Sequence, residues 1–245
     1  MKDCLVVIPS RYGATRFPGK VLAKLGGRTI VEWCWRAAKA ADVGPVVVAT
    51  EHPKVVEAVA AFGGEAVLTS ASCPSGSDRV HAAARGRRSP FIINLQGDAP
   101  LIRPSTIRKV AEVLRKNPKA DMSTAVMPLE DPARLQDPNV VKAALCADGR
   151  ALYFSRSPIP FPRNAHAAVH REHLGIYGYR RKALDRFVSL PPSALERAES
   201  LEQLRALEDG MTIYAALVSD RPVAIDTPAD LRRAERILKK VRGMK

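Results

Sequence analysis

A loop that combines glycine with several cations follows the first apolar run of the chain. It reads IPSRYGATRFPGK from Ile8 to Lys20 and offers Arg11, Arg16 and Lys20 together with Gly13. Glycine lets main-chain N–H groups approach phosphate oxygens, and the cationic side chains add charge-assisted hydrogen bonds. The segment has neither a G-x-x-x-x-G-K-[ST] string nor a helix-opening G-x-G-x-x-G, which disfavours a P-loop or a dinucleotide site. The loop predicts a triphosphate site of another kind, and a solvated turn is the alternative.

Two aspartates are candidates for a metal site. Asp98 ends the segment NLQGD after an apolar run, and Asp226 precedes Thr227 and Pro228 at the start of the last helical pattern. Mg²⁺ binds through one or two carboxylates together with substrate phosphates and water. Thr227 can serve as the N-cap, with Pro228 in the first turn and Asp230 completing the cap, so Asp226 is left for a ligand. Each aspartate could instead only bond its own turn.

Residues suited to binding a carboxylate lie farther along the chain. Arg156 follows the apolar stretch ALYFS, and a guanidinium there could pair a carboxylate through two parallel hydrogen bonds. His173, Gly175, Tyr177 and Tyr179 alternate, so they share one face of a predicted strand. A polar strand face predicts a ligand wall, whereas Arg156 alone could be a surface residue.

Three histidines suggest a zinc site, which we do not expect. His166, His170 and His173 have helical i, i+4, i+7 spacing. The strand-like segment LGIYGY begins directly after His173 and breaks the helix that this spacing needs. No nearby cysteine or acidic pair would complete a tetrahedral site. We expect His166 and His170 to be exposed to solvent.

The order of apolar runs predicts an α/β fold with a doubly wound, mostly parallel sheet. Short β-branched runs alternate with helical patterns at Leu5–Ile8, Ile30–Ala41, Val46–Ala49, Val55–Phe62, Ala66–Leu68, Arg79–Ala84, Phe91–Leu95 and Ile107–Leu114. In such folds the ligands bind beyond the carboxyl ends of the strands. Between about 128 and 180 the pattern loosens into short strands, which predicts a small inserted antiparallel subdomain in a single domain. A helix over Ala198–Leu207 and a strand at Ile213–Val218 then return to the main layer.

Composition fits a soluble, cytoplasmic enzyme of 245 residues. It has no apolar run of roughly 20 residues that could span a bilayer, and its start lacks the pattern of a signal peptide. Four cysteines occur without a C-x-x-C pair, so we expect reduced thiols.

The net charge of +14 suits either nucleic acid or small anionic substrates. Aromatic residues make up only 5%, and no stretch interleaves them with basic residues, which disfavours a nucleic-acid-binding module. The densest basic cluster lies in the segment 232–245, where its spacing indicates the solvated side of a helix.

Several motifs together resemble one family. The strings VIPSRYGATRFPGK, LYFSR, HLGIYGY and LEQLR, with QGD and DTP in the expected order, are similar to those of the 3-deoxy-manno-octulosonate (KDO) cytidylyltransferases, or CMP-KDO synthetases. The resemblance covers Val6 to Leu231. Sialate cytidylyltransferases carry a different loop, with two glycines followed by serine and lysine. One departure is Ala99-Pro100, where the family pattern has Glu-Pro.

The resemblance implies a nucleotide-diphospho-sugar transferase-like fold and a Mg²⁺-dependent reaction. CMP passes from CTP to KDO and pyrophosphate is released, in lipopolysaccharide precursor synthesis, by a homodimer formed partly through the inserted region. Alternative substrates are 8-amino-KDO and a sialic-acid-like nonulosonate, and a nucleic-acid-binding module is a remote alternative.

The same resemblance assigns residues to each part of the site. The nucleotide-binding residues are Ser10, Arg11, Gly13, Arg16, Lys20, Ser75, Gly76 and Arg79. The catalytic residues are Arg11, Lys20, Asp98 and Asp226, of which Asp98 and Asp226 hold the metal. The sugar-acid residues are Gln96, Arg156, His173, Tyr177, Glu202 and Gln203.

Overall fold

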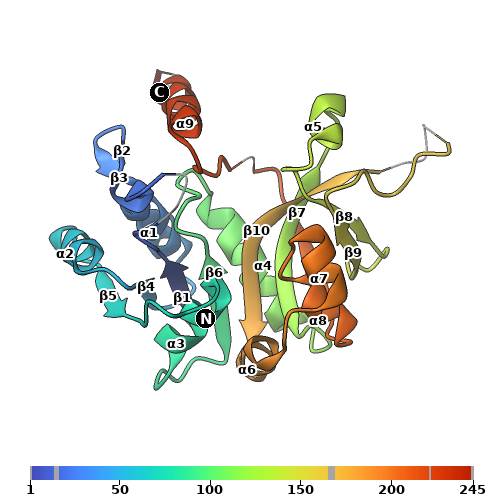
Figure 1. Ribbon diagram of the computed structural model, residues 1–245, viewed down its shortest axis with the longest axis horizontal. Helices are drawn as coiled ribbons and strands as arrows, with labels where there is room; N and C mark the ends of the chain where they lie inside the picture. Colours follow the sequence, from blue (N-terminus) through green and yellow to red (C-terminus); the bar gives the residue numbers. More distant parts are fainter. Residues whose placement is uncertain (1, 14–16, 165–168, 221, 244–245) are drawn as a thin grey trace. The chain divides into compact units, whose positions relative to one another are not determined.

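The computed structural model describes residues 2–13, 17–164, 169–220 and 222–243, with the side chains of 241–243 left out. The chain forms two compact units (Figure 1). The first comprises Met1–Ile107 and Arg221–Lys245, and the second comprises Arg108–Asp220. The predicted insertion at about 128–180 falls within the second unit. In the described residues, no helix has the length and apolar character needed to cross a membrane.

A parallel sheet forms the centre of the first unit. Its strands are β1 (Cys4–Pro9), β4 (Val46–Thr50), β5 (Glu65–Leu68) and β6 (Phe91–Leu95), in the order β6-β1-β4-β5. All three neighbouring pairs are parallel, with Val6 opposite Val46 and Ile93. Strand β1 is buried along its whole length, as expected for a parallel strand that is covered on both faces.

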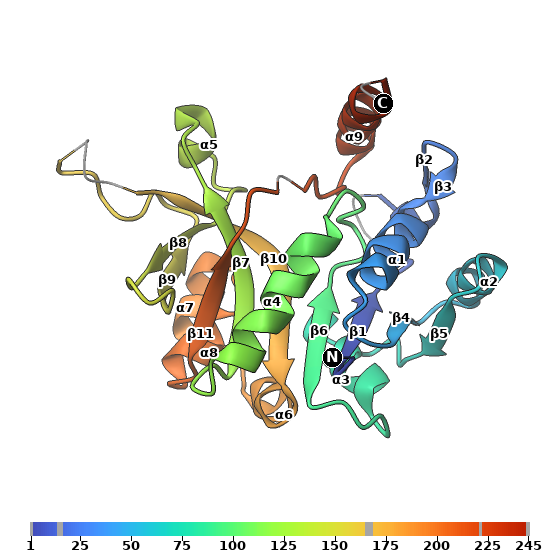
Figure 2. The same ribbon diagram turned by 180° about the vertical axis from the view of Figure 1, so that it is seen from behind.

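Helices α1 (Ile30–Ala41), α2 (Pro53–Ala61) and α3 (Gly76–Ala84) connect these strands. The chain moves outward from β1 to β4 and β5, and then returns past β1 to β6. Because crossover connections are right-handed, this reversal puts α3 on the opposite face from α1 and α2 (Figures 1 and 2). The reversal also leaves a crevice beyond the carboxyl ends of β1 and β6, where ligands of such sheets bind.

Three short elements and the last helix close the first unit at the carboxyl edge of its sheet. They are the 3₁₀ turn η1 (Lys20–Leu22), strands β2 (Lys24–Leu25) and β3 (Arg28–Thr29), and helix α9 (Pro228–Gly243). Leu25 and Ile30 form a buried cluster with Ile225 and Ala234. This cluster fixes the segment before α9 against the segment that follows the glycine-rich loop.

The second unit is built around mixed strand pairing. Strand β7 (Met122–Pro128) pairs parallel to β11 (Ile213–Leu217) and antiparallel to β10 (Arg171–Arg180). Strands β8 (Lys142–Leu145) and β9 (Ala151–Ser155) form an antiparallel pair, and β8 also pairs with β10. The register of β10 on β7 shifts between Leu174 and Tyr177.

Helices complete the second unit. Its helices are α5 (Pro132–Gln136), α6 (Arg181–Ser189), α7 (Ala194–Glu199) and α8 (Leu204–Glu208), and α4 (Pro104–Lys116) spans the boundary between the units.

The fold class predicted from the sequence is confirmed, with one error in an element. The parallel sheet, its crossover helices and the antiparallel strands all occur. The prediction of one helix over Ala198–Leu207 is wrong, because the chain forms α7 and α8 with a break between them. Ser200 ends α7 in the left-handed conformation, at a φ of 51°. That conformation stops the helix and turns Leu201–Gln203 away from its axis.

Candidate active site

A pocket of about 260 Å³ lies at the carboxyl ends of β1 and β6 in the first unit. Residues from four separate segments line it. They include seven of the predicted site residues, namely Arg11, Lys20, Ser75, Gly76, Arg79, Gln96 and Asp98. Gln96 therefore lies among the nucleotide-binding candidates, whereas the other sugar-acid candidates belong to the second unit.

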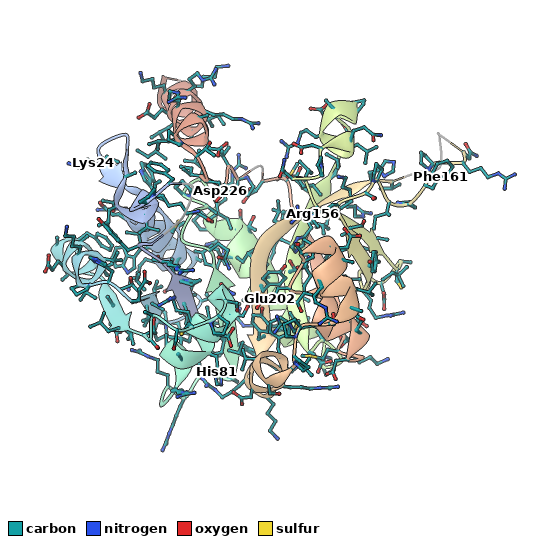
Figure 3. All side chains as sticks on the ribbon, in the orientation of Figure 1. Lys24, His81, Arg156, Phe161, Glu202 and Asp226 are labelled. Atoms are coloured by element: carbon teal, nitrogen blue, oxygen red, sulfur yellow. The ribbon has the colours of Figure 1, made fainter. Side chains whose placement is uncertain are left out.

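The ammonium of Lys20 joins the two predicted metal ligands. Its Nζ lies 2.7 Å from Oδ2 of Asp98 and 2.8 Å from Oδ1 of Asp226, whose turn leads into α9 (Figure 3). Gly19, in the left-handed conformation at a φ of 69°, begins the turn that places Lys20 there. Burial alone would lower the pKa of the lysine, but the charge of Asp98 and hydrogen bonds to both carboxylates outweigh burial and raise it. Lys20 is therefore a cation at neutral pH.

Asp98 is held in place through the main chain. A side chain at Gly97 would meet Oγ of Ser10 at 2.5 Å and the carbonyl oxygen of Pro9 at 2.8 Å, so only glycine allows this close approach. The main-chain N–H of Ile225 donates to the carbonyl of Asp98 at 2.9 Å. The turns that carry the two carboxylates are therefore bonded directly to each other.

The carboxylate that caps α9 is that of Asp230. Oδ2 of Asp230 accepts hydrogen bonds from the main-chain N–H groups of Asp226 and Thr227, and the Thr227 hydroxyl accepts from the N–H of Asp230. This is the reciprocal capping arrangement that the sequence predicted. The cap leaves the Asp226 carboxylate to face Lys20.

The glycine-rich loop is bonded to the segment after β4. The main-chain N–H groups of Tyr12 and Gly13 both donate to Oε1 of Glu51, at 2.8 Å and 3.4 Å. From the sequence we expected glycine to let main-chain N–H groups of this loop approach phosphate. The N–H groups of Tyr12 and Gly13 instead bond Glu51. Arg11 lines the pocket, and Ser10 is buried with its hydroxyl donating to the carbonyl of Ile8. Arg16 lies outside the described residues.

Helix α3 brings its first turn to the same pocket. Ser75 is the N-cap, and its Oγ accepts from the main-chain N–H groups of Ser77 and Asp78. Arg79 is only 3% exposed; its Nη1 donates to Oγ1 of Thr69 and lies 3.3 Å from Oε2 of Glu51. Arg79 thus reaches the pocket with part of its charge already compensated.

Main-chain carbonyls hold Arg156 in the second unit. Its guanidinium donates to the carbonyls of Glu199, Pro138 and Ser200, and its main-chain N–H donates to the Glu199 carboxylate. Three of the five guanidinium N–H groups thus bond carbonyls, and the other two have no hydrogen bond among the described residues. Figure 3 shows Arg156 and Glu202 in this unit.

His173 is a buried neutral imidazole. Its Nε2 lies 3.0 Å from Oγ1 of Thr124, which can donate its single hydrogen to the carbonyls of Leu174 or Ile176. Nε2 is therefore suited to donate to Thr124. Burial lowers the pKa of His173 to about 3, so the ring carries no charge at neutral pH.

Tyr177 and Gln203 both belong to the second unit. The ring of Tyr177 lies 5.4 Å from that of His173, centroid to centroid. Burial raises the pKa of Tyr177 well above its ordinary value, with smaller effects from Tyr179 and Glu202. Gln203 is 4% exposed, and its Nε2 has no hydrogen-bond partner among the residues that the structure describes. A buried donor in that state is a candidate for binding a ligand.

The described residues do not support a zinc site. His170 bonds the carbonyl of Ile159 through Nδ1, His173 bonds Thr124, and His166 lies outside the described residues. Within residues 2–13, 17–164, 169–220 and 222–243, no group of three or more His, Cys, Asp or Glu side chains is placed to hold a metal.

Sequence reasoning missed Glu51 and Glu199. Glu51 follows β4, and a charged residue at the carboxyl end of a parallel strand is a signal that could have been used. Glu199 ends the short helix α7, and nothing in its local sequence separates it from a solvated helix residue. Both residues contact segments that are distant along the chain.

Comparison with known proteins identifies the family. The family model described as "Cytidylyltransferase" matches residues 5–213. The "3-deoxy-manno-octulosonate cytidylyltransferase" of Elusimicrobium minutum is 50% identical over 98% of this chain and 99% of the relative. That of Paramagnetospirillum magneticum is 47% identical over 96% and 97%. This chain belongs to the 3-deoxy-manno-octulosonate cytidylyltransferase family.

Solved structures agree with this membership. A CMP:2-keto-3-deoxy-manno-octonic acid synthetase complexed with CTP is 39% identical, has a TM-score of 0.92, and is matched over 97% of this chain and 98% of its own. A 4-diphosphocytidyl-2C-methyl-D-erythritol synthase from Anaerococcus prevotii has a TM-score of 0.67 at 11% identity, which shows a shared fold. Family membership thus confirms the resemblance seen in the motifs, while the roles of individual site residues stay predictions.

His173 makes the stability of this cytidylyltransferase family member depend on pH. The unfolded chain protonates the imidazole near pH 6.5, whereas the folded chain does so only near pH 3. Between these values the unfolded state binds more protons, so stability falls as the pH falls. We expect this group to cost about 2 kcal/mol of unfolding free energy between pH 7 and pH 5.

Urea denaturation at both pH values measures this effect. The His173→Gln variant should lose that share of the pH dependence. A variant with the full wild-type dependence would show that His173 does not cause it.

Proposed function

We propose that this protein transfers CMP from CTP to 3-deoxy-manno-octulosonate and releases pyrophosphate, with Mg²⁺, in lipopolysaccharide precursor synthesis. The convergence of Lys20, Asp98 and Asp226 beside the cationic pocket carries the proposal. That pocket combines groups that bind a triphosphate with carboxylates suited to its metal. Near-full-length identity to relatives named for this activity supports the choice of sugar.

The reaction needs positioning more than covalent chemistry. The anomeric hydroxyl of the sugar attacks the α-phosphorus of CTP, the bond to the β-phosphate oxygen breaks, and pyrophosphate leaves from the opposite side. Arg11 and Lys20 stabilise negative charge on the phosphates, and Gln96 and the first turn of α3 orient the nucleotide. We assign no covalent intermediate and no dedicated general base.

The carboxylate pair fits the metal that the family implies. Oδ2 of Asp98 and Oδ1 of Asp226 already converge on one cation, the ammonium of Lys20. Carboxylate oxygens are the ligands that Mg²⁺ takes from proteins, with phosphate oxygens and water completing the shell. When bound, the ion would offset phosphate charge and lower the pKa of a coordinated hydroxyl. Asp98 and Asp226 are the residues that would hold it.

The second unit supplies the groups that suit a sugar acid. Arg156 has two N–H groups that the described contacts do not use, and a carboxylate can accept both. Gln203 has a buried donor, and His173 and Tyr177, whose rings lie 5.4 Å apart, offer neutral polar atoms. Neutral groups suit the sugar hydroxyls, while the guanidinium fixes the charged end.

We also propose a homodimer in the cytoplasm. Leu152, Phe161 and Val169 in the second unit are 54%, 84% and 61% exposed, and Phe161 is labelled in Figure 3. Large apolar side chains at this exposure support self-association of the region. Sedimentation of the purified chain measures its oligomeric state.

Pyrophosphate release across a panel of substrates tests the activity. We expect the highest turnover with CTP and KDO, and abolition of turnover when divalent metal is chelated. The panel compares the four nucleoside triphosphates, each with KDO, its 8-amino analogue and N-acetylneuraminate. A higher rate with the 8-amino analogue or N-acetylneuraminate would show that KDO is not the preferred sugar. Full activity in the presence of chelator would show that the reaction needs no divalent metal.

Asp98→Asn tests the carboxylate pair. The substitution keeps the shape of the side chain but removes its charge, so we expect most of the turnover to be lost while the thermal unfolding temperature stays near that of the wild type. Asp185→Asn, on the exposed side of α6, is the matched control and should keep full activity. Unchanged turnover of Asp98→Asn at saturating Mg²⁺ would mean that Asp98 only stabilises its own turn and holds no metal.

Arg156→Lys tests the sugar-acid assignment. A lysine cannot reproduce the planar fork that bonds three carbonyls and a ligand, so the apparent KM for KDO should rise by about tenfold to a hundredfold. Calorimetry with CTP should give nearly the wild-type affinity. Arg197→Lys, on exposed α7, is the matched control. Equal weakening of both ligands would assign Arg156 to the triphosphate, and no effect would make it a surface residue.

A further inference from the structure

The start of the glycine-rich loop is held by a carboxylate rather than left open. Oε1 of Glu51 accepts from the main-chain N–H groups of Tyr12 and Gly13. The Glu51 side chain is only 13% exposed. Two main-chain donors from neighbouring residues thus share one acceptor oxygen from a distant segment, so this contact restricts the loop.

Aromatic stacking holds the same stretch from the side. The ring of Tyr12 stacks on that of His52, with 4.0 Å between centroids and 24° between planes. The carbonyl of Tyr12 also accepts from the N–H of Gly19, the residue before Lys20. Glu51 and His52, both directly after β4, thus fix Tyr12, which lies between Arg11 and the turn that places Lys20.

The other carboxylate oxygen of Glu51 lies next to Arg79. Oε2 is buried, lies 3.3 Å from Nη1 of Arg79, and has no hydrogen bond within the described part of the chain. Arg79 lines the pocket. A negative charge beside this guanidinium reduces the attraction of the pocket for a triphosphate, so Glu51 has two opposing effects on nucleotide binding.

We propose that Glu51 is the positioning residue of the phosphate loop. Its hydrogen bonds to Tyr12 and Gly13 hold the loop so that Arg11 and Lys20 face the triphosphate, and this positioning outweighs the repulsion from its charge. The inference rests on the proposed function, because it assigns the pocket to CTP. It predicts that the acceptor oxygen of Glu51, and not its charge, is what CTP binding needs.

A pair of substitutions separates the oxygen from the charge. Glu51→Gln keeps an acceptor for the two N–H groups and removes the charge beside Arg79, so CTP should bind at least as tightly as to the wild type. Glu51→Ala removes both, and we expect the affinity for CTP to fall by about tenfold to a hundredfold. Glu57→Ala, on the exposed side of α2, is the matched control.

Two measurements test the proposal independently. Calorimetry with CTP and Mg²⁺ gives the affinity of each variant, and the KM for CTP should rise in Glu51→Ala while the KM for KDO stays near the wild-type value. Amide hydrogen exchange at Tyr12 needs no nucleotide. Its protection should persist in Glu51→Gln and fall by at least about tenfold in Glu51→Ala.

Each of the remaining outcomes contradicts one part of the proposal. Tighter CTP binding in both variants would mean that Glu51 acts only through repulsion. Equal rises in both KM values with a lower unfolding temperature would mean a general structural role. Unchanged exchange at Tyr12 would remove the positioning contact itself. A wild-type protein that does not bind CTP, with the exchange pattern as expected, would refute the proposed function and leave the contact intact.

Discussion

The ion pairs of Lys20 with Asp98 and Asp226 are the interaction on which the first unit's site depends. They join the turn after the glycine-rich loop, the turn after β6 and the turn before α9. Two carboxylates held this close repel each other, so a cation between them is a condition for the arrangement. In the proposed function, the same two carboxylates would hold the metal ion.

Close approach of main chains makes these ion pairs possible. Gly97 lets the Asp98 turn lie against the end of β1, and the bond from Ile225 to Asp98 brings in the last segment of the chain. The apolar cluster around Leu25 and Ile30 then anchors that segment to β2 and to the start of α1. Charge placement in this pocket is therefore determined by packing and by the absence of a side chain at one position.

The second unit fixes its cations in another way. The ammonium of Lys142 is fully buried and donates to the carbonyls of Asp137, Val140 and Arg156. Arg156 in turn donates to carbonyls on both sides of its segment. Carbonyl oxygens satisfy the N–H groups without cancelling the charge, so the guanidinium of Arg156 stays attractive to an acid. In the proposed function, a carboxylate partner in the same place would compete with the sugar acid.

The sequence alone determined the features that depend on a few neighbouring residues. These were the alternation of strands and helices, the cap built by Thr227 and Asp230, and the cations and glycines of the loop that ends at Lys20. Motifs of this length also carried the family resemblance. Each is encoded locally, because hydrophobic period, capping and turn chemistry act within about one helical turn.

Only the tertiary structure decided which of these groups meet. Glu51 accepts hydrogen bonds from the main chain of Tyr12 and Gly13. Lys20 pairs with Asp226, and the Glu199 carboxylate accepts from the main-chain N–H of Arg156. The break at Ser200 likewise depends on a left-handed residue that the helical pattern around it does not indicate. Such contacts follow from the order of strands in a sheet and from how closely two backbones approach. Neither is recorded in the period or the composition of a single segment.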